Sequence, residues 1–231
     1  MPSWLNKLFA FIITLAVPVV LILSNVFLFA TPEWLAFQYS QPDFPPSVRF
    51  TPADRYKFAS ESIEYIRGNR TLAQFRALDV YEEREIKHMI DVRELVDKVK
   101  LILPTLALLA IVAVIVLARR TSTPALPLKG GGSLVAARAL VNGAMLTIGL
   151  FLFVGIFAAV GFQTFFTLFH RIFFEGDTWL FNYTDSLIQF YPLPFWFATS
   201  LALVGLTIVQ AAIIGAIGWW WGRAVSTRSA Q

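Results

Sequence analysis

Four long apolar runs without a charged residue restrict what this chain can fold into. They cover residues 8–30, 101–118, 139–169 and 192–221. As a helix, each run is long enough to cross the roughly 30 Å of hydrocarbon in a lipid bilayer. Hydrophobic residues make up 57% of the chain, which is too apolar for an ordinary soluble domain. The sequence therefore predicts an all-α membrane protein with four transmembrane helices.

The charges between these runs indicate how the chain crosses the membrane. The segments expected on one side, which include the loop of residues 119–138, contain seven Lys or Arg residues and no acid. Basic residues beside a span are retained in the cytoplasm, so both termini should be cytoplasmic. All 15 acidic residues fall in residues 31–100, expected to form an extracytoplasmic cap, and residues 170–191, expected to form an extracytoplasmic loop. The inner bases account for the +4 formal charge, and no nucleic-acid partner is expected.

The expected cap contains signals for two helices. Thr51-Pro52 combines a capping residue with proline at the first helical position, and Gly68 follows the periodic apolar residues as a stop signal. A second capping pattern predicts a helix that begins at Val80 and runs through His88 toward the second span. The cap is therefore predicted to be helical.

The chain contains no cysteine and two histidines, His88 and His170. The lack of cysteine removes disulfides and excludes a thiol acyl-enzyme. Both histidines lie on the expected outer side, close to an apolar run. Because imidazole titrates near neutral pH, a pair at the mouth of a helical bundle suggests acid-base chemistry on a substrate at the level of the lipid.

Charged residues flank His88 on its predicted helix. Arg84, Glu85 and Asp91 lie three or four positions away and share its face. A carboxylate at that spacing would orient the imidazole and raise its basicity. In the alternative interpretation these charged residues face solvent and form ion pairs along the helix surface.

His170 directly follows an apolar run rich in phenylalanine. In the alternative reading, His170 and Arg171 anchor the chain at the headgroup level, and Phe166 and Phe169 serve packing. Residues 139–169 would measure about 46 Å as one helix, which exceeds the hydrocarbon thickness. The outer turn of that helix is therefore expected to project into the cap.

Several motifs in the second half of the chain occur together. They are HMIDV at residues 88–92 after Glu85, FHRIFF at 169–174, WLF at 179–181 and LIQFYPLPFW at 187–196. This combination resembles the lipoprotein intramolecular transacylase (Lit) family, a group also described as a bacterial integral membrane protein domain of unknown function. The resemblance covers about residues 80–196.

The resemblance implies a four-helix bundle in the bacterial cytoplasmic membrane, with its active site on the outer face beneath the cap. It implies a diacylglyceryl-modified lipoprotein as substrate and no cofactor or metal. The sn-2 acyl chain would move to the α-amino group of the lipoprotein's N-terminal cysteine, giving a lyso-form N-acyl lipoprotein. The two catalytic histidines of this family map onto His88 and His170.

Roles for the surrounding residues follow as expectations. His88 is expected to act as base, oriented by Asp91 or Glu85, and His170 as acid, although the roles can be reversed. Candidates for contacts to the oxyanion or glyceryl group, with ion pairing as the alternative, are Arg84, Arg93 and Arg171. Candidates for the substrate pocket are Phe166, Phe169, Phe173, Trp179 and Trp196.

Two other classes of function are open at this point. The histidines with Glu85 or Asp91 can supply the ligands of a metal-dependent membrane hydrolase. A non-enzymatic assembly or sensor protein would tolerate replacement of either histidine. Transport is disfavoured because the four spans contain no charged residue. Membrane lipid is an expected partner in every case, and no oligomeric state is predicted.

Overall fold

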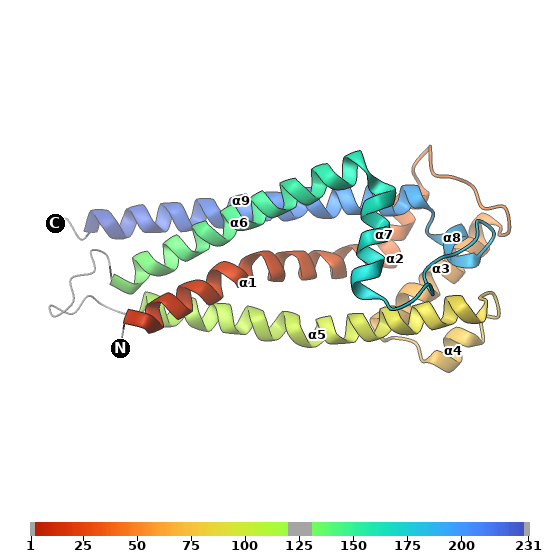
Figure 1. Ribbon diagram of the computed structural model, residues 1–231, viewed down its shortest axis with the longest axis horizontal. Helices are drawn as coiled ribbons and strands as arrows, with labels where there is room; N and C mark the ends of the chain where they lie inside the picture. Colours follow the sequence, from red (N-terminus) through yellow and green to blue (C-terminus); the bar gives the residue numbers. More distant parts are fainter. Residues whose placement is uncertain (1–2, 120–130, 229–231) are drawn as a thin grey trace. The chain divides into compact units, whose positions relative to one another are not determined.

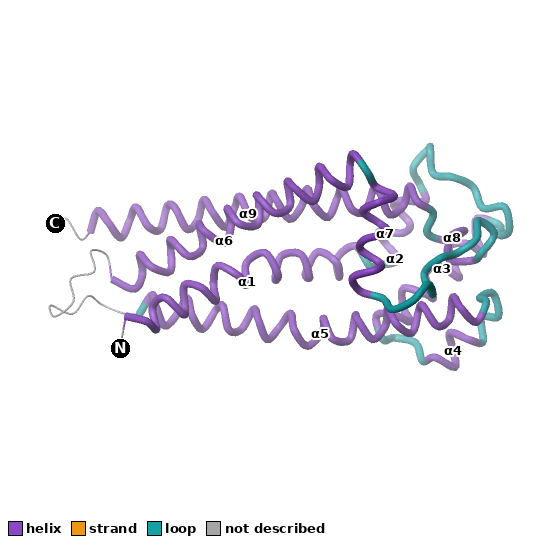
Figure 2. Tube along the Cα trace, viewed as in Figure 1, coloured by secondary structure: helices purple, strands orange, loops and turns teal. Residues whose placement is uncertain are grey.

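The described part of the chain is helical. The computed structural model describes residues 3–119 and 131–228, and these residues form helices, turns and loops without a strand (Figures 1 and 2). Residues 120–130 of the expected inner loop lie outside the described residues. In chain order the helices are α1 (Ser3–Phe29), α2 (Pro32–Tyr39), α3 (Pro52–Arg67), α4 (Leu72–Arg76), α5 (Glu83–Ala118), α6 (Gly131–Val160), α7 (Phe162–Phe173), α8 (Ser186–Phe190) and α9 (Leu193–Arg228).

Four of these helices are long and apolar enough to cross a membrane, namely α1, α5, α6 and α9. The prediction of an all-α membrane protein with four spans is confirmed. Ten charged residues lie in the first half of α5, up to Lys100, so only residues 101–118 of this helix can form its span.

The chain divides into two compact units. Unit 1 consists of residues 1–25, 101–154 and 204–231, and unit 2 of residues 26–100 and 155–203. Both histidines and all the acidic residues belong to unit 2. The candidate site can therefore be described within one unit.

Small residues line the helix contacts in unit 1. Its buried core consists of Ile13, Ala113, Leu117, Ala136 and Ala139. A buried polar cluster joins α1 to α9, where Asn25 Nδ2 donates to Thr207 Oγ1 at 2.9 Å and to Gln210 Oε1 at 2.8 Å. Small side chains and interhelical hydrogen bonds are typical of helix association in membranes.

The first cap helix begins and ends where the sequence predicts. Thr51 caps α3 by accepting a hydrogen bond from the amide of Asp54, and Pro52 is its first residue. Gly68 ends the helix with φ of 99°, a left-handed conformation that glycine adopts without steric penalty. This prediction is confirmed.

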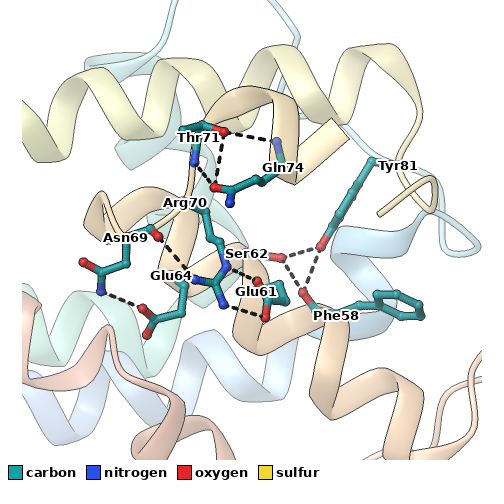
Figure 3. A network of polar contacts seen from close by, with 9 residues as sticks. All are labelled: Phe58, Glu61, Ser62, Glu64, Asn69, Arg70, Thr71, Gln74 and Tyr81. Atoms are coloured by element: carbon teal, nitrogen blue, oxygen red, sulfur yellow. Dashed lines mark hydrogen bonds and ion pairs between the residues drawn. The ribbon is translucent and has the colours of Figure 1, made fainter. Parts of the chain in front are cut away.

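Short helices α2, α4 and α8 were not predicted from the sequence. In α4 a capping box forms between Thr71 and Gln74, and the network in Figure 3 fixes the turn before it. There the Arg70 guanidinium pairs with Glu61 at 2.6 Å, and Asn69 Nδ2 donates to the carboxylate of Glu64 at 2.6 Å (Figure 3). These bonds hold α4 against the end of α3.

The second predicted cap helix starts later than expected. It was expected from Val80, whereas α5 begins at Glu83, after Asp79 adopts φ of 53°. Glu85 Oε2 accepts a hydrogen bond from the amide of Glu82 at 2.9 Å. This side chain satisfies a free amide at the helix start, which fixes where α5 begins.

The expected single helix over residues 139–169 is divided in two. α6 ends at Val160, and the chain changes direction at Gly161 before α7 begins at Phe162 (Figure 1). Gly161 has φ of −138° and ψ of 56°, outside the helical region. Gly161 is one of four glycines in this run, and Gly143, Gly149 and Gly155 stay helical, so low helix propensity permits the break at Gly161 without determining its place. The break places His170 on a separate short helix.

The core of unit 2 is aromatic. It packs α3, α4, α5 and α8 around Phe75 and Phe190, which are 1% and 0% exposed. Tyr191 donates a buried hydrogen bond to the carbonyl of Ala59, joining the end of α8 to α3. This core holds the first turns of α5, and hence His88, in place.

Candidate active site

The structure brings the two histidines together. His88 lies in the second turn of α5 and His170 in the last turn of α7. Their ring centroids are 6.0 Å apart, with 30° between the ring planes. Each residue is only 8% exposed. Two imidazoles that are 82 positions apart in the sequence therefore share one buried site.

Aromatic side chains enclose the pair. The Phe174 ring lies 4.9 Å from His88 and 5.6 Å from His170, between centroids. Phe181 packs edge-on against His88 at 5.5 Å, and Trp179 lies 5.0 Å from His170. The histidines consequently sit in an apolar environment of low dielectric constant.

A backbone hydrogen bond fixes the tautomer of His170. Its Nδ1 lies 2.7 Å from the carbonyl oxygen of Phe166, one turn earlier in α7. Because a carbonyl oxygen can only accept, Nδ1 must carry the proton. The neutral ring therefore has its lone pair on Nε2, the nitrogen that can take a proton.

His88 has a different environment. Its Nδ1 is buried and has no hydrogen-bond partner among the described residues. Neither Glu85 nor Asp91, the carboxylates expected to orient the imidazole, therefore accepts a hydrogen bond from this nitrogen. Without a carboxylate beside it, the His88 ring is not stabilised as a cation.

Burial keeps both rings neutral. Loss of solvation, assisted by the nearby His170, lowers the pKa of His88 from 6.5 to about 4. Burial also lowers the pKa of His170, although the bond with the Phe166 carbonyl opposes the shift. Both histidines lie outside the membrane spans, and both are uncharged at neutral pH.

The two candidate carboxylates have other partners. Glu85 is fully buried, and its Oε1 accepts from the amide of Leu187 at 2.7 Å, which joins the start of α5 to α8. Burial raises the pKa of Glu85, while this bond and that from the Glu82 amide oppose the increase. Asp91 accepts a long hydrogen bond of 3.4 Å from Thr178 Oγ1, in the loop after α7. Both carboxylates support the site's framework.

The three candidate arginines are placed differently. Arg84 pairs with Asp185 and lies 5.8 Å from the Phe181 ring centroid, so it holds the loop that covers His88. Arg93 pairs with Asp97 at 2.8 Å and donates to the backbone carbonyl of Tyr65. Arg93 therefore forms an ion pair, which was the alternative to a contact with the oxyanion or glyceryl group.

Arg171 is solvent-exposed beside His170 on α7. Its neighbour Ile172 is also exposed, at 74%. Of the three candidate arginines, the structure therefore ties only Arg84 to the enclosure of the histidines.

The candidate pocket residues form the wall next to His170. Phe166 is closest, with its ring 4.1 Å from His170, and Trp179 is buried at 6% exposure. Phe169 packs against both His170 and Phe173, and these two phenylalanines are 41% and 49% exposed. Trp196 reaches Phe166 at 6.3 Å. All five candidates belong to this cluster, which runs from the buried histidine to exposed apolar surface.

Three residues of the site were not selected from the sequence. Phe174 and Phe181 lie within the recognised motifs, but nothing in the sequence shows that their rings contact His88. Asp185 is 101 positions from Arg84 and forms its ion pair only through the fold.

The donor set for the metal-hydrolase alternative is not assembled. No group of three His, Cys, Asp or Glu side chains lies close enough to hold a metal ion within residues 3–119 and 131–228. Glu85 directs its oxygens at two backbone amides. The histidine pair therefore lacks the third protein ligand that such a site needs.

Fold and site together define a four-span helical membrane protein with a buried, neutral histidine pair. The chain belongs to the lipoprotein intramolecular transacylase Lit family, whose model matches residues 10–196. The resemblance seen in the motifs is thereby confirmed.

Known relatives match over almost the whole chain. An uncharacterized protein of Aquifex aeolicus (strain VF5) is 23% identical over 91% of this chain and 96% of its own length. The in meso structure of the lipoprotein intramolecular transacylase Lit from Bacillus cereus has a TM-score of 0.78 at 18% identity, covering 96% of this chain and 98% of that one. A variant of that protein with arginine in place of a histidine gives a TM-score of 0.73 at 18% identity, covering 98% and 95%. At these identities the two structures establish the fold.

Proposed function

We propose that this protein transfers the sn-2 acyl chain of a diacylglyceryl-cysteine lipoprotein to the α-amino group of that same cysteine. The product is a lyso-form lipoprotein with one N-linked acyl chain. In the reaction a bond forms between the acyl carbonyl carbon and the amine nitrogen, the bond between that carbon and the glyceryl oxygen breaks, and one proton passes from nitrogen to oxygen. The observation that carries this proposal is the enclosed, neutral histidine pair, with rings 6.0 Å apart.

His170 is the base in this proposal, which reverses the first assignment of roles. The bond from its Nδ1 to the Phe166 carbonyl leaves the Nε2 lone pair for the substrate. When the substrate amine attacks the ester carbonyl, Nε2 takes the surplus proton from nitrogen. The same nitrogen then gives that proton to the departing glyceryl oxygen, so the enzyme ends the cycle unchanged.

His88 acts as a neutral hydrogen-bond donor. Its pKa of about 4 makes it a poor proton acceptor, and no carboxylate stabilises its cationic form. A neutral imidazole can still donate its N–H to the oxyanion of the tetrahedral intermediate. In an apolar, water-poor site such a donor contributes strongly to transition-state stabilisation.

The remaining catalysis comes from positioning. Amine and ester belong to one substrate molecule, so no enzyme nucleophile is needed, in keeping with the lack of cysteine. Holding the two groups in reacting geometry can contribute roughly 7 to 11 kcal/mol. We assign the acyl chain to the exposed apolar surface at Phe169 and Phe173, next to the histidines.

The proposed membrane orientation places the cap and this site on the outer face. Support comes from the separation of charge, since unit 1 contains seven bases and no acid, whereas all 15 acids are in unit 2. The base-rich segments, including both termini, are accordingly assigned to the cytoplasm. A lipoprotein that has been anchored and exported would meet the site from the outer leaflet.

Expression in a host that makes only diacylglyceryl lipoproteins tests the function. Tandem mass spectrometry of the N-terminal lipopeptide should show one N-linked and one O-linked chain. The His170→Asn variant should leave both chains O-linked, while the exposed loop variant Glu175→Gln should behave as the parent. Two O-linked chains with the unaltered protein, folded and in the membrane, would contradict the proposal.

A further inference from the structure

A groove in unit 1 combines two arginines with an apolar floor. It lies between α6 and α9 and has a volume of about 370 Å³. We call it the basic groove and define it by Arg138, Val141 and Asn142 of α6 and Trp219, Gly222 and Arg223 of α9. It contains neither histidine, and its role does not depend on the proposed reaction.

The two arginines have no counter-charge within their unit. The segments of unit 1 contain no Asp or Glu at all. Arg138 and Arg223 are both exposed, and Arg223 places its guanidinium 4.8 Å from the Trp219 ring centroid. No Asp or Glu side chain of unit 1 is therefore available to neutralise these two groups, and an anionic ligand can do so.

Glycine shapes the groove. A Cβ on Gly218 would lie 2.9 Å from the carbonyl oxygen of Ala137, so α6 and α9 pack closely at this level. A Cβ on Gly222, one turn further along α9, would lie 3.5 Å from the Ala137 Cβ and 3.7 Å from Leu134 Cδ1, so this glycine leaves the groove wall without a side chain at that level.

The walls of the groove distinguish between ligands. Arginine binds phosphate oxygens through its planar N–H groups. Leu134 and Val141 add apolar surface that a free inorganic ion would not use, and Trp219 is suited to the membrane-water interface. A phosphodiester joined to a glycerol and acyl chains satisfies both the charged and the apolar parts.

We propose that the basic groove binds the headgroup phosphate of an anionic phospholipid, with Arg138 and Arg223 holding the phosphate and the apolar wall contacting the start of the acyl chains. Basic pockets between membrane helices are suited to such headgroups. The lipid would supply the negative charge that unit 1 lacks, and it would link α6 to α9 at the base-rich end.

Native mass spectrometry of the delipidated full chain, titrated with phosphatidylglycerol, tests this site. The Arg138→Gln/Arg223→Gln double variant should bind roughly tenfold to thirtyfold more weakly than the parent. A matched control, Lys7→Gln/Arg119→Gln, removes the same charge from unit 1 outside the groove and should change affinity by less than about threefold.

Two further ligands identify what is bound. Phosphatidylcholine with the same acyl chains and soluble glycerol phosphate should both bind the parent at least about tenfold more weakly than phosphatidylglycerol. Equal weakening by the control variant would show unspecific attraction to basic residues and overturn the proposal. Equal affinity for phosphatidylcholine or for glycerol phosphate would likewise exclude an anionic lipid site.

Discussion

The Nδ1 atom of His170 lies 2.7 Å from the carbonyl oxygen of Phe166, one turn earlier on the same helix. This contact makes the two histidines unequal. His170 has a fixed tautomer with an available Nε2, whereas His88 Nδ1 has no partner in the described chain. The division of roles into base and oxyanion donor rests on this difference.

Substitutions should reveal that division. An amide can replace a neutral N–H donor but cannot replace a base, so His88→Asn should retain more activity than His88→Leu. At His170, Asn and Leu should be equally damaging, each lowering kcat by about 10²- to 10⁴-fold. Rates measured with a purified lipopeptide substrate test this, with thermal unfolding in detergent as the control for folding. The opposite pattern would return the role of base to His88.

The stability of the protein should depend on pH through His88. Its folded pKa of about 4 is below the ordinary 6.5, so the unfolded chain binds more protons between these values. Stabilisation is thus fully present above pH 6.5 and is lost as pH falls toward 4, by at most about 3 kcal/mol for this group. The thermal midpoint should fall less steeply in His88→Asn over this window, with pH 8 as the reference. An equal fall of the thermal midpoint with pH in the parent and in His88→Asn would contradict burial of a neutral His88.

Removing the ring that covers both histidines should alter the pH dependence of catalysis. Phe174→Ala admits water, which raises both histidine pKa values toward 6.5. The acid limb of the rate-pH profile should consequently move to higher pH. Phe173→Ala, at a neighbouring position that is 49% exposed, serves as the control and should leave that limb in place. A shift of equal size in both variants would argue against enclosure by Phe174.

The ion pair between Arg84 and Asp185 should stabilise the loop that carries Phe181. The Asp185 side chain is 9% exposed and that of Arg84 42% exposed. A double-mutant cycle with Arg84→Gln and Asp185→Asn should give a coupling energy of about 1 kcal/mol. The more exposed pair of Arg76 and Glu83 is the control, and its coupling should be close to zero. Equal coupling in both cycles would remove the special role of Asp185.

The sequence reveals the spans and the catalytic candidates because their signals are local. The uncharged runs, the Thr51-Pro52 helix start and the presence of only two histidines can all be read from consecutive residues. Partners that meet only after folding cannot be read in this way. Glu85 was expected to orient His88, yet it accepts a hydrogen bond from the amide of Leu187.

The break at Gly161 was missed for a related reason. Glycines also occur inside the apolar helices, as at Gly149 and Gly205, so composition does not distinguish a break from an uninterrupted span. What separates Gly161 is the amphipathic sequence after it, which forms α7 and buries His170 while Ile172 stays exposed. Packing within unit 2 therefore determines that the helix breaks at Gly161.

Close packing of α6 and α9 can be tested at Gly218. An added methyl group would lie 2.9 Å from the backbone oxygen of Ala137, which cannot move aside alone. Gly218→Ala should therefore destabilise the protein by about 1 to 3 kcal/mol. Gly205, also in α9, has no atom within 4 Å of the same methyl position, so Gly205→Ala is the control and should not destabilise. Thermal unfolding in detergent measures both, and a neutral Gly218→Ala would refute the close approach.

The most direct test uses the purified protein and a synthetic diacylglyceryl-cysteine lipopeptide with an isotope label confined to the sn-2 acyl chain. The account predicts that tandem mass spectrometry will find the label on the α-amino nitrogen of the cysteine, with the unlabelled chain still on the glyceryl group. In His170→Asn the labelled amide should form at least about a hundredfold more slowly. A label that stays on oxygen, is released as free fatty acid, or moves equally well in His170→Asn would contradict it.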